Sequence, residues 1–299
     1  MKILITDGIG DEALRYLHTS NIETVTLEDN YNKDEIFAVI VRSRFVINHS
    51  FMSNYKNIKI VAKLGTGLDN VDVQYCEKNN INVLNAPGLN ANATAEFTLG
   101  LLMSIVKNLL VVREKVNQKD YRRNLYYGRE LKSLKVGIIG YGNIGKLLHK
   151  KIENLVSEVY INSRKLDLNN HKSIDELLSD SDIVILSLSL QGNENLVNSK
   201  FLEKFKKNAI LINIARGGLI FEKDMIDFLE KNKEFIYCTD VLEKEPQYNL
   251  PPELQSYENK MFTLGNFIYT PHIAGMTCES QQNISNYISK EIVKRLLNG

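Results

Sequence analysis

The chain of 299 residues lacks tryptophan and has only five prolines and three cysteines. Cys76, Cys238 and Cys278 lie far apart and form no C-x-x-C pair. This spacing predicts buried thiols in a reducing compartment and offers no metal site. The formal net charge is only +1. A charge this small provides no global field that would attract nucleic acid or an anionic membrane.

Long apolar runs are also missing. The longest, Leu99 to Val106, is far shorter than the roughly 20 residues that cross a bilayer. The apolar run at the start of the chain is too short for a signal peptide, and it is followed too early by the acidic Asp7. The segment from Met1 to Asp7 instead predicts a strand. We therefore expect a cytoplasmic protein, with a length that suits two domains of about 150 residues each.

What the chain does contain is a glycine-rich segment, residues 135–145, around which the rest is organised. Gly140, Gly142 and Gly145 have the G-x-G-x-x-G spacing. Between a strand and a helix, the first glycine would make the tight turn and the second would let the backbone approach a pyrophosphate. The third would let the helix pack closely against the strand.

The context of these glycines favours a dinucleotide site over a plain structural turn, which is the alternative. Residues 146–156 have apolar side chains at helical spacing, and Glu158 to Asn162 predicts a second strand. Together they form a βαβ unit of about the expected 30 residues. The helix would begin near Asn143 and Ile144 and present its free N–H groups and partial positive charge to phosphates.

The same alternation of strands and helices extends over most of the chain. Apolar runs predict strands at 2–6, 22–25, 37–41, 58–62, 81–84, 183–188, 209–214, 235–238 and 267–269. Helical patterns fall at 11–18, 174–178, 201–205 and 223–231, and a last helix at 277–297 is expected to return to the first part of the chain. Such alternation is typical of an α/β fold with doubly wound parallel sheets.

Residues 90–118 form the longest helical pattern and predict a single helix. Asn92 or Thr94 would cap it, with Glu96 in the first turn. Its apolar residues go most of the way round, which predicts burial on several sides. The helix could belong to the core, connect two domains or lie at a subunit interface, and the polar residues 119–132 would follow as a connector.

Two places in the first part of the chain suggest chemistry. Arg42 lies at the carboxyl end of a predicted strand, the edge where open parallel sheets bind ligands. Lys63 ends another strand and is followed by a glycine loop, including Thr66 and Gly67, whose N–H groups could hold a small anion. A solvated charge and a plain turn are the alternatives.

Three segments at strand ends in the second half are more specific: Ile212 to Gly218, Thr239 to Pro246 and Thr270 to Gly275. Together with the glycine turn they resemble the D-isomer-specific 2-hydroxyacid dehydrogenases. This family includes phosphoglycerate, glycerate and formate dehydrogenases and the glyoxylate/hydroxypyruvate reductases. Residues 65–72 and 85–96 match the first domain of the family, so the resemblance covers essentially the whole chain.

The resemblance implies two Rossmann-like doubly wound domains with the active site in the cleft between them. We expect a substrate-binding domain at residues 1–95, completed by the helix at 277–299, and a dinucleotide-binding domain at residues 96–276. A homodimer through the long helix near residues 95–118 is also implied. Because the chain ends at Gly299, we expect no serine feedback through the C-terminal regulatory domain of some phosphoglycerate dehydrogenases.

The resemblance also assigns three catalytic residues. Arg216 matches the arginine that grips the substrate carboxylate and keto oxygen with its planar fork. His272 matches the acid that protonates that oxygen and acts as the base in reverse; an unperturbed imidazole, with a pKa near ~6.5, can do either. Glu245 matches the carboxylate that orients this imidazole and favours its charged form. Each motif alone is usually a turn or loop, but their order behind the glycine turn favours a common role.

The remaining site residues follow from the same resemblance. Asp240 would meet the carboxamide side of the nicotinamide, and the N–H groups of Thr66 and Gly67 would complete the substrate carboxylate site. Further contacts to the cofactor are implied for Thr94, Ser187, Leu188, Ile214 and Ala215. Ser189 and Gln191 depart from the proline and threonine that are common in the family, which leaves the shape of the adenine pocket open. Phe221 replaces a common aspartate and is interpreted as surface variation.

The end of the second strand predicts a preference for NADPH, although NAD remains possible. NAD enzymes place an acidic residue here, which binds the ribose 2′-hydroxyl and repels a 2′-phosphate. In this chain the position falls on Ser163, followed by Arg164 and Lys165, and a shift of one residue would place Asn162 there. A hydroxyl and two cations suit a 2′-phosphate, and the same pattern occurs in NADPH-using glyoxylate/hydroxypyruvate reductases. An ordinary basic turn is the alternative.

The sequence leaves the substrate and the direction of the reaction open. Arg42 and Lys63 match positions where phosphoglycerate dehydrogenases hold the substrate phosphate, whereas Thr94 is similar to the glyoxylate and hydroxypyruvate reductases. We predict an oxidoreductase acting on 3-phosphoglycerate/phosphohydroxypyruvate or glyoxylate/hydroxypyruvate. A nucleotide-sensing corepressor of the same fold is the alternative from another class, and a cofactor-binding scaffold is disfavoured because no member of the triad is lost.

Overall fold

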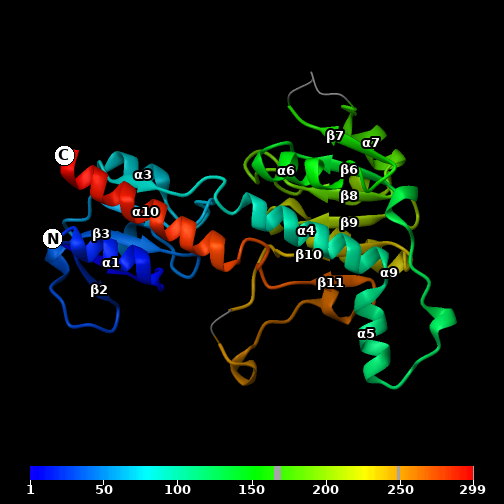
Figure 1. Cartoon of the computed structure of the whole chain (residues 1–299), viewed down its shortest axis with the longest axis horizontal. Helices are drawn as coiled ribbons and strands as arrows, with labels where there is room; N and C mark the ends of the chain where they lie inside the picture. Colours follow the sequence, from blue (N-terminus) through cyan, green and yellow to red (C-terminus); the bar gives the residue numbers. More distant parts are fainter. Residues whose placement is uncertain (165–169, 248–249, 299) are drawn as a thin grey trace. The chain divides into compact units, whose positions relative to one another are not determined.

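The computed structural model describes residues 1–164, 170–247 and 250–298 (Figure 1). The chain divides into two compact units. Unit 1 comprises Met1–Asn90 and Met276–Gly299, and unit 2 comprises Ala91–Gly275. Each unit is built around its own parallel sheet, with five strands in unit 1 and six in unit 2. The expected α/β fold with two parallel sheets is therefore confirmed.

The sheet of unit 1 has the strand order β2-β1-β3-β4-β5. Its strands are β1 (Lys2–Ile5), β2 (Glu23–Thr26), β3 (Ile36–Val41), β4 (Ile60–Lys63) and β5 (Asn82–Leu84). All neighbouring strands are parallel. The order changes direction between β1 and β3, and such a switch point is where open α/β sheets bind ligands outside the carboxyl ends of their strands.

Helix α10 (Cys278–Asn298) lies far along the chain but belongs to unit 1, where it packs against α1 (Asp11–Thr19) and β4. The reason is its apolar stripe: Ile284, Ile288 and Ile292 recur every four residues and therefore lie on one face. All three are buried in a core that also contains Leu17 of α1. The short helices α2 (His49–Met52) and α3 (Val73–Lys78) complete the unit.

The sheet of unit 2 has the order β11-β10-β9-β8-β6-β7, again with every neighbouring pair parallel. Its strands are β6 (Lys135–Ile139), β7 (Glu158–Asn162), β8 (Ile183–Leu186), β9 (Ile210–Asn213), β10 (Ile236–Thr239) and β11 (Phe267–Tyr269). The central strands are continuous apolar runs because helices cover both faces. The switch point lies between β6 and β8.

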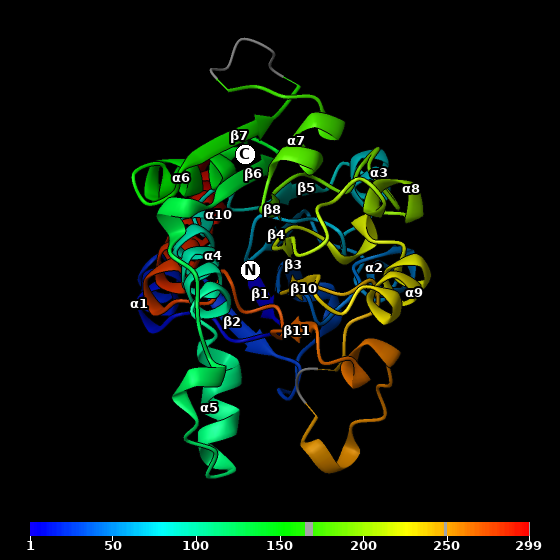
Figure 2. The same cartoon turned by 90° about the vertical axis from the view of Figure 1, so that its right-hand side faces the viewer.

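Helices α4 (Ala91–Val106) and α6 (Asn143–Ile152) cover one face of this sheet, and α7 (Ile174–Asp180), α8 (Ser199–Leu202) and α9 (Glu222–Lys231) cover the other (Figure 2). Leu102 of α4 and Leu148 of α6 share one core cluster with Ile138 of β6. Leu177 and Met225 belong to the cluster on the opposite face. The sheet therefore holds its strand ends rigidly between two cores.

The expected single helix at 90–118 is wrong, because the chain breaks after α4 and continues as α5 (Leu109–Asn117) at an angle of 61°. Asn108 adopts a left-handed conformation (φ 55°), which asparagine tolerates better than most residues. The connector stabilises the break: Arg129 N–H donates to the carbonyl oxygen of Val106 (2.9 Å), and the Asn108 side chain donates to the carbonyl oxygen of Tyr127 (2.7 Å).

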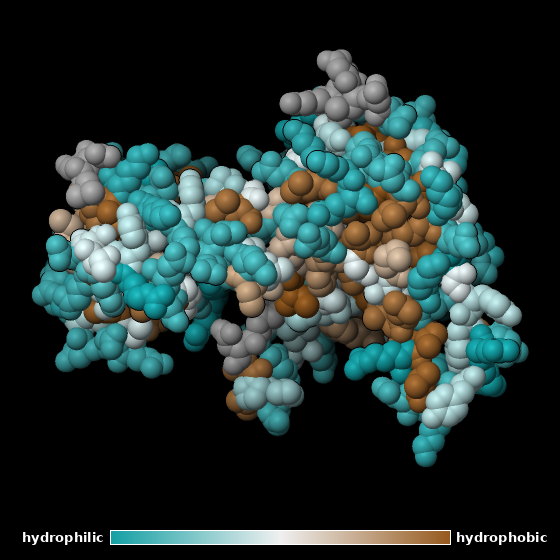
Figure 3. All heavy atoms as spheres, in the orientation of Figure 1, coloured by the Kyte–Doolittle hydropathy of each residue, from teal (hydrophilic) through white to brown (hydrophobic). Residues whose placement is uncertain are grey.

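Two further expectations for this region are wrong. The helix begins at Ala91, so neither Asn92 nor Thr94 is its cap. Burial on several sides holds for α4, but α5 buries no residue, and Leu109, Leu110 and Val111 are 54%, 41% and 47% exposed. Apolar side chains gather over α4 and α5 on the face seen in Figure 3. Within the described ranges no single helix could cross a membrane; α4 and α5 have sufficient length and apolarity only together, across their bend.

Candidate active site

The backbone of the glycine turn after β6 is packed so closely at two positions that a side chain there would clash. Gly140 has φ +98°, and a Cβ there would lie 2.6 Å from the carbonyl oxygen of Ser187. A Cβ at Gly145 would lie 2.2 Å from the carbonyl oxygen of Gly140. These two glycines therefore let the strand, the turn and α6 pack together. Gly142 differs, because a Cβ there would meet nothing within 4 Å.

The open side of this turn could hold a phosphate group. Gly142 is the N-terminal cap residue of α6 and no side chain caps the helix, which starts with Asn143. No side chain therefore caps the first N–H groups of α6, including those of Asn143 and Ile144, and they carry the partial positive charge of the helix. Ser187 follows β8 across the switch point and donates from its hydroxyl to the carbonyl oxygen of Gly140 (2.7 Å), which places Leu188 next to the turn.

The predicted ribose loop begins where β7 ends. Ser163 is half-buried and Arg164 is exposed. Lys165 lies outside the described residues. The imidazole Nε2 of His171 lies 3.0 Å from the carbonyl oxygen of Ser163. The backbone N–H of Lys172 donates to the carbonyl oxygen of Ile161 (2.9 Å). The returning chain therefore holds the base of this loop, which is a role for His171 that the sequence did not reveal.

Arg216 follows β9 in a turn that Asn213 braces. The Asn213 side chain accepts from Ala215 N–H (3.0 Å) and donates to the carbonyl oxygen of Arg216 (3.0 Å), and Asn213 is fully buried. The guanidinium of Arg216 donates to the carbonyl oxygen of Ala215 (2.7 Å). Ile214 and Ala215 are buried beneath the turn. Sequence reasoning missed Asn213, although a polar residue ending an apolar strand was the available signal.

The turn that carries Arg216 lies directly against the segment that carries Glu245. A Cβ at Gly217 would lie only 1.9 Å from the carbonyl carbon of Leu242. Only glycine permits this contact between two backbones. Because β9 and β10 are adjacent and parallel, the residues that follow them emerge at the same edge of the sheet.

His272 and Glu245 form a direct pair. Nδ1 of His272 lies 2.9 and 3.1 Å from the two carboxylate oxygens of Glu245. A carboxylate only accepts hydrogen bonds, so Nδ1 carries the proton in this contact. The His272 side chain is 39% exposed. Nε2 is therefore the imidazole nitrogen left to meet a substrate.

Asp240 organises the turn after β11. Its carboxylate accepts from the Thr270 hydroxyl (2.6 Å) and from the N–H groups of Ile273 (3.0 Å) and Ala274 (2.8 Å). Asp240 is 1% exposed, and this burial raises the pKa of its carboxyl although the hydrogen bonds oppose the change. The described contacts of the carboxylate are thus to the turn of His272, and a contact to the nicotinamide stays a prediction.

Thr94 lies on α4 and is 4% exposed, and its carbonyl oxygen accepts from the Thr98 hydroxyl (2.7 Å). This position places Thr94 inside unit 2. Its expected contact with the cofactor stays a prediction.

In unit 1, Arg42 directly follows β3, and Lys63 is the last residue of β4. The Arg42 guanidinium donates from Nε to the carbonyl oxygen of Gly8 (3.3 Å) and also contacts the amide oxygen of Gln281. Lys63 is 4% exposed, so it is not a solvated surface charge.

Two partners of Lys63 are polar side chains of the neighbouring loops. Its ammonium donates to the Asn70 amide oxygen (2.7 Å) and the Ser43 hydroxyl (3.1 Å). Thr66 donates from its hydroxyl to the carbonyl oxygen of Ala86 (3.1 Å) and the Asn90 amide oxygen (2.9 Å), which fixes the loop that ends in Gly67. Both loops are therefore held by defined hydrogen bonds.

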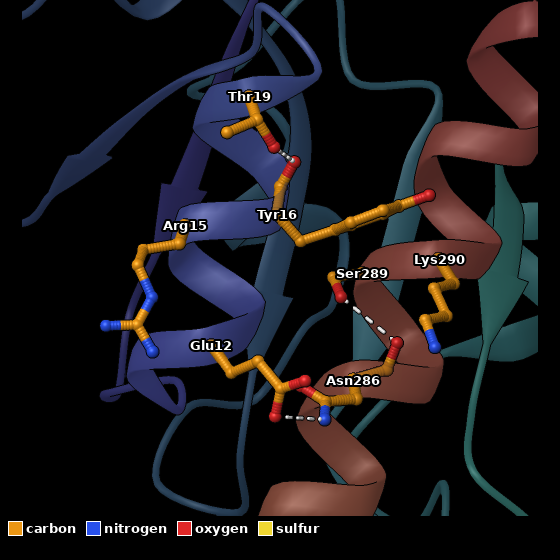
Figure 4. A pocket seen from close by; sticks show the side chains of 7 residues that line it. All are labelled: Glu12, Arg15, Tyr16, Thr19, Asn286, Ser289 and Lys290. Atoms are coloured by element: carbon orange, nitrogen blue, oxygen red, sulfur yellow. Dashed lines mark hydrogen bonds between the residues drawn. The ribbon is translucent and has the colours of Figure 1, made fainter.

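A hollow of about 230 Å³ lies elsewhere in unit 1, between α1 and α10 (Figure 4). The residues that line it each carry a polar or charged group and are Glu12, Arg15, Tyr16, Thr19, Asn286, Ser289 and Lys290. Glu12 accepts from the side chains of Asn286 and Gln282 (both 2.8 Å) and so joins the two helices. The predicted site residues do not line this hollow.

The parallel sheet, the glycine turn at its switch point and the His272–Glu245 pair at the same edge are the features of a dinucleotide-binding α/β protein. Residues 99–274 match the NAD binding domain of the D-isomer specific 2-hydroxyacid dehydrogenases, and the chain belongs to this family. Unit 2 is therefore a binding domain for a nicotinamide cofactor.

Relatives of the chain include two kinds of enzyme. A D-3-phosphoglycerate dehydrogenase from Archaeoglobus fulgidus is 28% identical over 98% of this chain and 57% of its own length. A hydroxypyruvate reductase from Thermotoga maritima is 29% identical over 99% of this chain and 98% of its own length. The chain thus spans little more than half of the first relative and nearly all of the second.

A solved structure shows the same fold. The NAD+-bound 3-phosphoglycerate dehydrogenase of Entamoeba histolytica has a TM-score of 0.81 and 25% identity, with 100% of this chain and 96% of that chain covered.

Proposed function

We propose that the protein is an NAD(P)-dependent dehydrogenase that transfers a hydride between the nicotinamide and C2 of a small 2-keto or D-2-hydroxy acid. The observation that carries this proposal is the His272–Glu245 pair, with Nδ1 2.9 Å from the carboxylate, at the edge of the sheet where the glycine turn also lies. The names of the relatives, D-3-phosphoglycerate dehydrogenase, hydroxypyruvate reductase and glyoxylate reductase, support the same class of reaction.

The cofactor supplies or accepts the hydride when bound. In the direction of reduction, the fork of Arg216 binds the carboxylate and the keto oxygen and draws electron density from C2. Nε2 of protonated His272 gives its proton to the oxygen that becomes the hydroxyl. Glu245 stabilises the imidazolium and fixes the ring through Nδ1. In the direction of oxidation, neutral His272 takes that proton back.

Groups of unit 1 extend the proposed substrate site. We infer that the N–H groups of Thr66 and Gly67 bind the substrate carboxylate. Arg42 and Lys63 bind a distal anionic group, which favours 3-phosphohydroxypyruvate over glyoxylate. The support for Lys63 is its burial at 4% exposure at the carboxyl end of β4, because the interaction of a cation with an anion is stronger away from bulk water.

We propose further that NADPH is the preferred cofactor. Ser163 and the exposed Arg164 directly follow β7, and no acidic residue ends this strand. A hydroxyl and a guanidinium can bind a 2′-phosphate, and Lys165 would add a second cation. The carbonyl oxygen of Ser163 lies 3.0 Å from Nε2 of His171, which supports a defined position for Ser163 itself.

A homodimer through α4 and α5 is the assembly that we propose. The support is the exposed apolar side chains of α5, since such patches on a protein surface commonly mark interaction sites. Sedimentation of the purified chain tests the proposal, and a monomer at micromolar concentration is the contrary result.

The experiment that tests the function is one panel of steady-state assays. NADPH and NADH are each combined with glyoxylate, hydroxypyruvate, 3-phosphohydroxypyruvate, pyruvate and longer 2-keto acids. We expect turnover with at least one short 2-keto acid, and His272→Ala as the matched inactive variant. Tight cofactor binding without turnover of any keto acid would contradict the proposal.

A further inference from the structure

Glu222 is the first residue of α9, and its carboxylate joins two distant parts of the chain. One oxygen accepts from the backbone N–H of Glu243 (3.3 Å), and the other accepts from the side-chain amide of Asn259 (3.1 Å). Glu243 lies two residues before Glu245. Asn259 comes 16 residues after Glu243 in the chain, just before the turn Lys260–Thr263 that precedes β11. A single carboxylate thus holds both ends of the segment that carries Glu245.

We propose that Glu222 is a positioning residue that keeps Glu245 at Nδ1 of His272. The inference rests on the proposed function of that pair. The beginning of the segment is also confined by the close backbone approach of Gly217 to Leu242. The Glu222 carboxylate supplies the second constraint, and the two together leave the beginning of the segment little freedom.

The orientation of Asn259 makes this contact specific. Its amide oxygen accepts from Met261 N–H (3.0 Å), so its amide nitrogen must face Glu222. The same nitrogen lies 3.3 Å from the hydroxyl of Tyr257. Glu222 is half-buried, and burial raises the pKa of its carboxyl while the two hydrogen bonds act in the opposite direction. The group is therefore sheltered from water as well as hydrogen-bonded.

The first test is Glu222→Gln, which keeps the size of the side chain. Glutamine has one acceptor oxygen, and after that oxygen binds Glu243 N–H its NH₂ group faces the NH₂ group of Asn259. We expect kcat to fall between about 10- and 100-fold, the range for a small misplacement of a catalytic group. Cofactor affinity should stay unchanged, because the glycine turn is untouched. The pH midpoint of kcat should move toward that of Glu245→Gln.

The second test reverses the polarity of the contact. Asn259→Asp alone brings a second carboxylate against Glu222 and should lower kcat. In the double variant E222Q/N259D, the glutamine can donate to the new carboxylate while that carboxylate still accepts from Met261 N–H. The double variant should therefore regain most of the lost kcat, a coupling that a double-mutant cycle measures directly.

Asp227→Asn is the matched control, because it makes the same change of charge at an exposed position of α9. It should leave kcat and its pH profile as in the wild type. Thermal midpoints identify loss of fold. Variants that lose only thermal stability, with kcat and pH profile unchanged, would overturn the inference. A double variant no more active than the single ones would overturn it as well.

A readout without turnover separates this inference from the proposed function. The imidazole signals of His272 can be followed by proton NMR over a pH titration, assigned with His272→Gln. If Glu222 positions Glu245, the titration of the His272 imidazole should shift in Glu222→Gln. It should recover in the double variant, even if no keto acid is reduced. An unshifted titration beside normal turnover would overturn the positioning role and leave the reaction standing.

Discussion

The backbone N–H of His272 donates to the carbonyl oxygen of Asp240 at 2.8 Å, and the carboxylate of Asp240 receives the next two N–H groups, those of Ile273 and Ala274. His272 has φ 55°, in the left-handed region that is uncommon for residues other than glycine. Successive N–H groups beside such a residue form a concavity that binds anions. Asp240 fills it, and so holds His272 in its unusual conformation.

Stability should depend on pH through Asp240 in a defined direction. Burial raises the pKa of its carboxyl above the ordinary value of 3.8, so the folded state keeps the proton to higher pH than the unfolded chain. The free energy of unfolding of the wild type, relative to Asp240→Asn, should therefore fall as pH rises from 3.8 through the native pKa and then stay level. Urea unfolding of both proteins between about pH 4 and about pH 8 measures this difference. A difference that rises with pH would contradict the assignment.

Substitution of the proposed catalytic residues should separate chemistry from binding. His272→Ala and Arg216→Ala should each lower kcat/KM by about 10²- to 10⁴-fold while cofactor affinity is retained. Glu245→Gln should lower the pH above which reduction fails, because the imidazolium loses its anionic partner. Steady-state kinetics over pH, with cofactor binding followed by fluorescence, check all three. Nearly unchanged turnover in both alanine variants would contradict the catalytic roles proposed for these residues.

Two glycines should respond oppositely to alanine. At Gly217 the new Cβ would lie 1.9 Å from Leu242, so Gly217→Ala should cost about 3 kcal/mol or more of unfolding free energy. At Gly142 the space is open, and stability should change by less than about 0.5 kcal/mol. Cofactor affinity should nevertheless fall about tenfold or more in Gly142→Ala, because the methyl group would meet the pyrophosphate. Undiminished affinity would place the phosphates elsewhere.

The cofactor preference can be reversed if the β7 loop reads the 2′-phosphate. The wild type should have a higher kcat/KM with NADPH than with NADH. In the variant Ser163→Asp/Arg164→Ala, a carboxylate replaces the hydroxyl and the guanidinium is removed, so use of NADPH should fall relative to NADH. Each lost charged hydrogen bond accounts for about 1.5–3 kcal/mol. Parent protein that already favours NADH, or a ratio that the variant leaves unchanged, would refute this interpretation.

Lys63 should distinguish a phosphorylated substrate from glyoxylate. Lys63→Ala should lower kcat/KM for 3-phosphohydroxypyruvate more than tenfold beyond its effect on glyoxylate, since a charged hydrogen bond contributes about 1.5–3 kcal/mol. Lys63→Ala would also remove the hydrogen bonds that the ammonium donates to Ser43 and Asn70, so a control is needed for this local disturbance. Asn70→Ala should disturb the loop without removing the cation. Equal losses of kcat/KM on both substrates in Lys63→Ala would mean that Lys63 does not bind the phosphate, and would favour glyoxylate or hydroxypyruvate as the substrate.

The sequence predicted those features that depend on neighbours in the chain. The βαβ unit around Gly140 could be predicted because its apolar spacing and its glycines lie within about 30 residues. The break at Asn108 could not, because it depends on Arg129 reaching back to Val106. The burial of Lys63 likewise depends on Ser43 and Asn70, which approach it only in the folded sheet.

The site followed the same pattern. Sequence motifs identified His272 and Glu245 as a pair, and the structure brings the two side chains into contact. The supports of the site, Asn213 beneath Arg216 and Glu222 behind Glu245, carry no motif of their own. They become visible only as hydrogen-bond partners.

The place of α10 affects the order in which the protein can be built during synthesis. Unit 1 needs α10 to cover the core that contains Leu17, yet α10 leaves the ribosome only after the whole of unit 2. Domains generally fold as units while the chain emerges. Unit 2 can therefore complete its sheet first, while the strands of unit 1, although made earlier, wait with an uncovered apolar face. Newly made chains would therefore be most vulnerable to aggregation through unit 1.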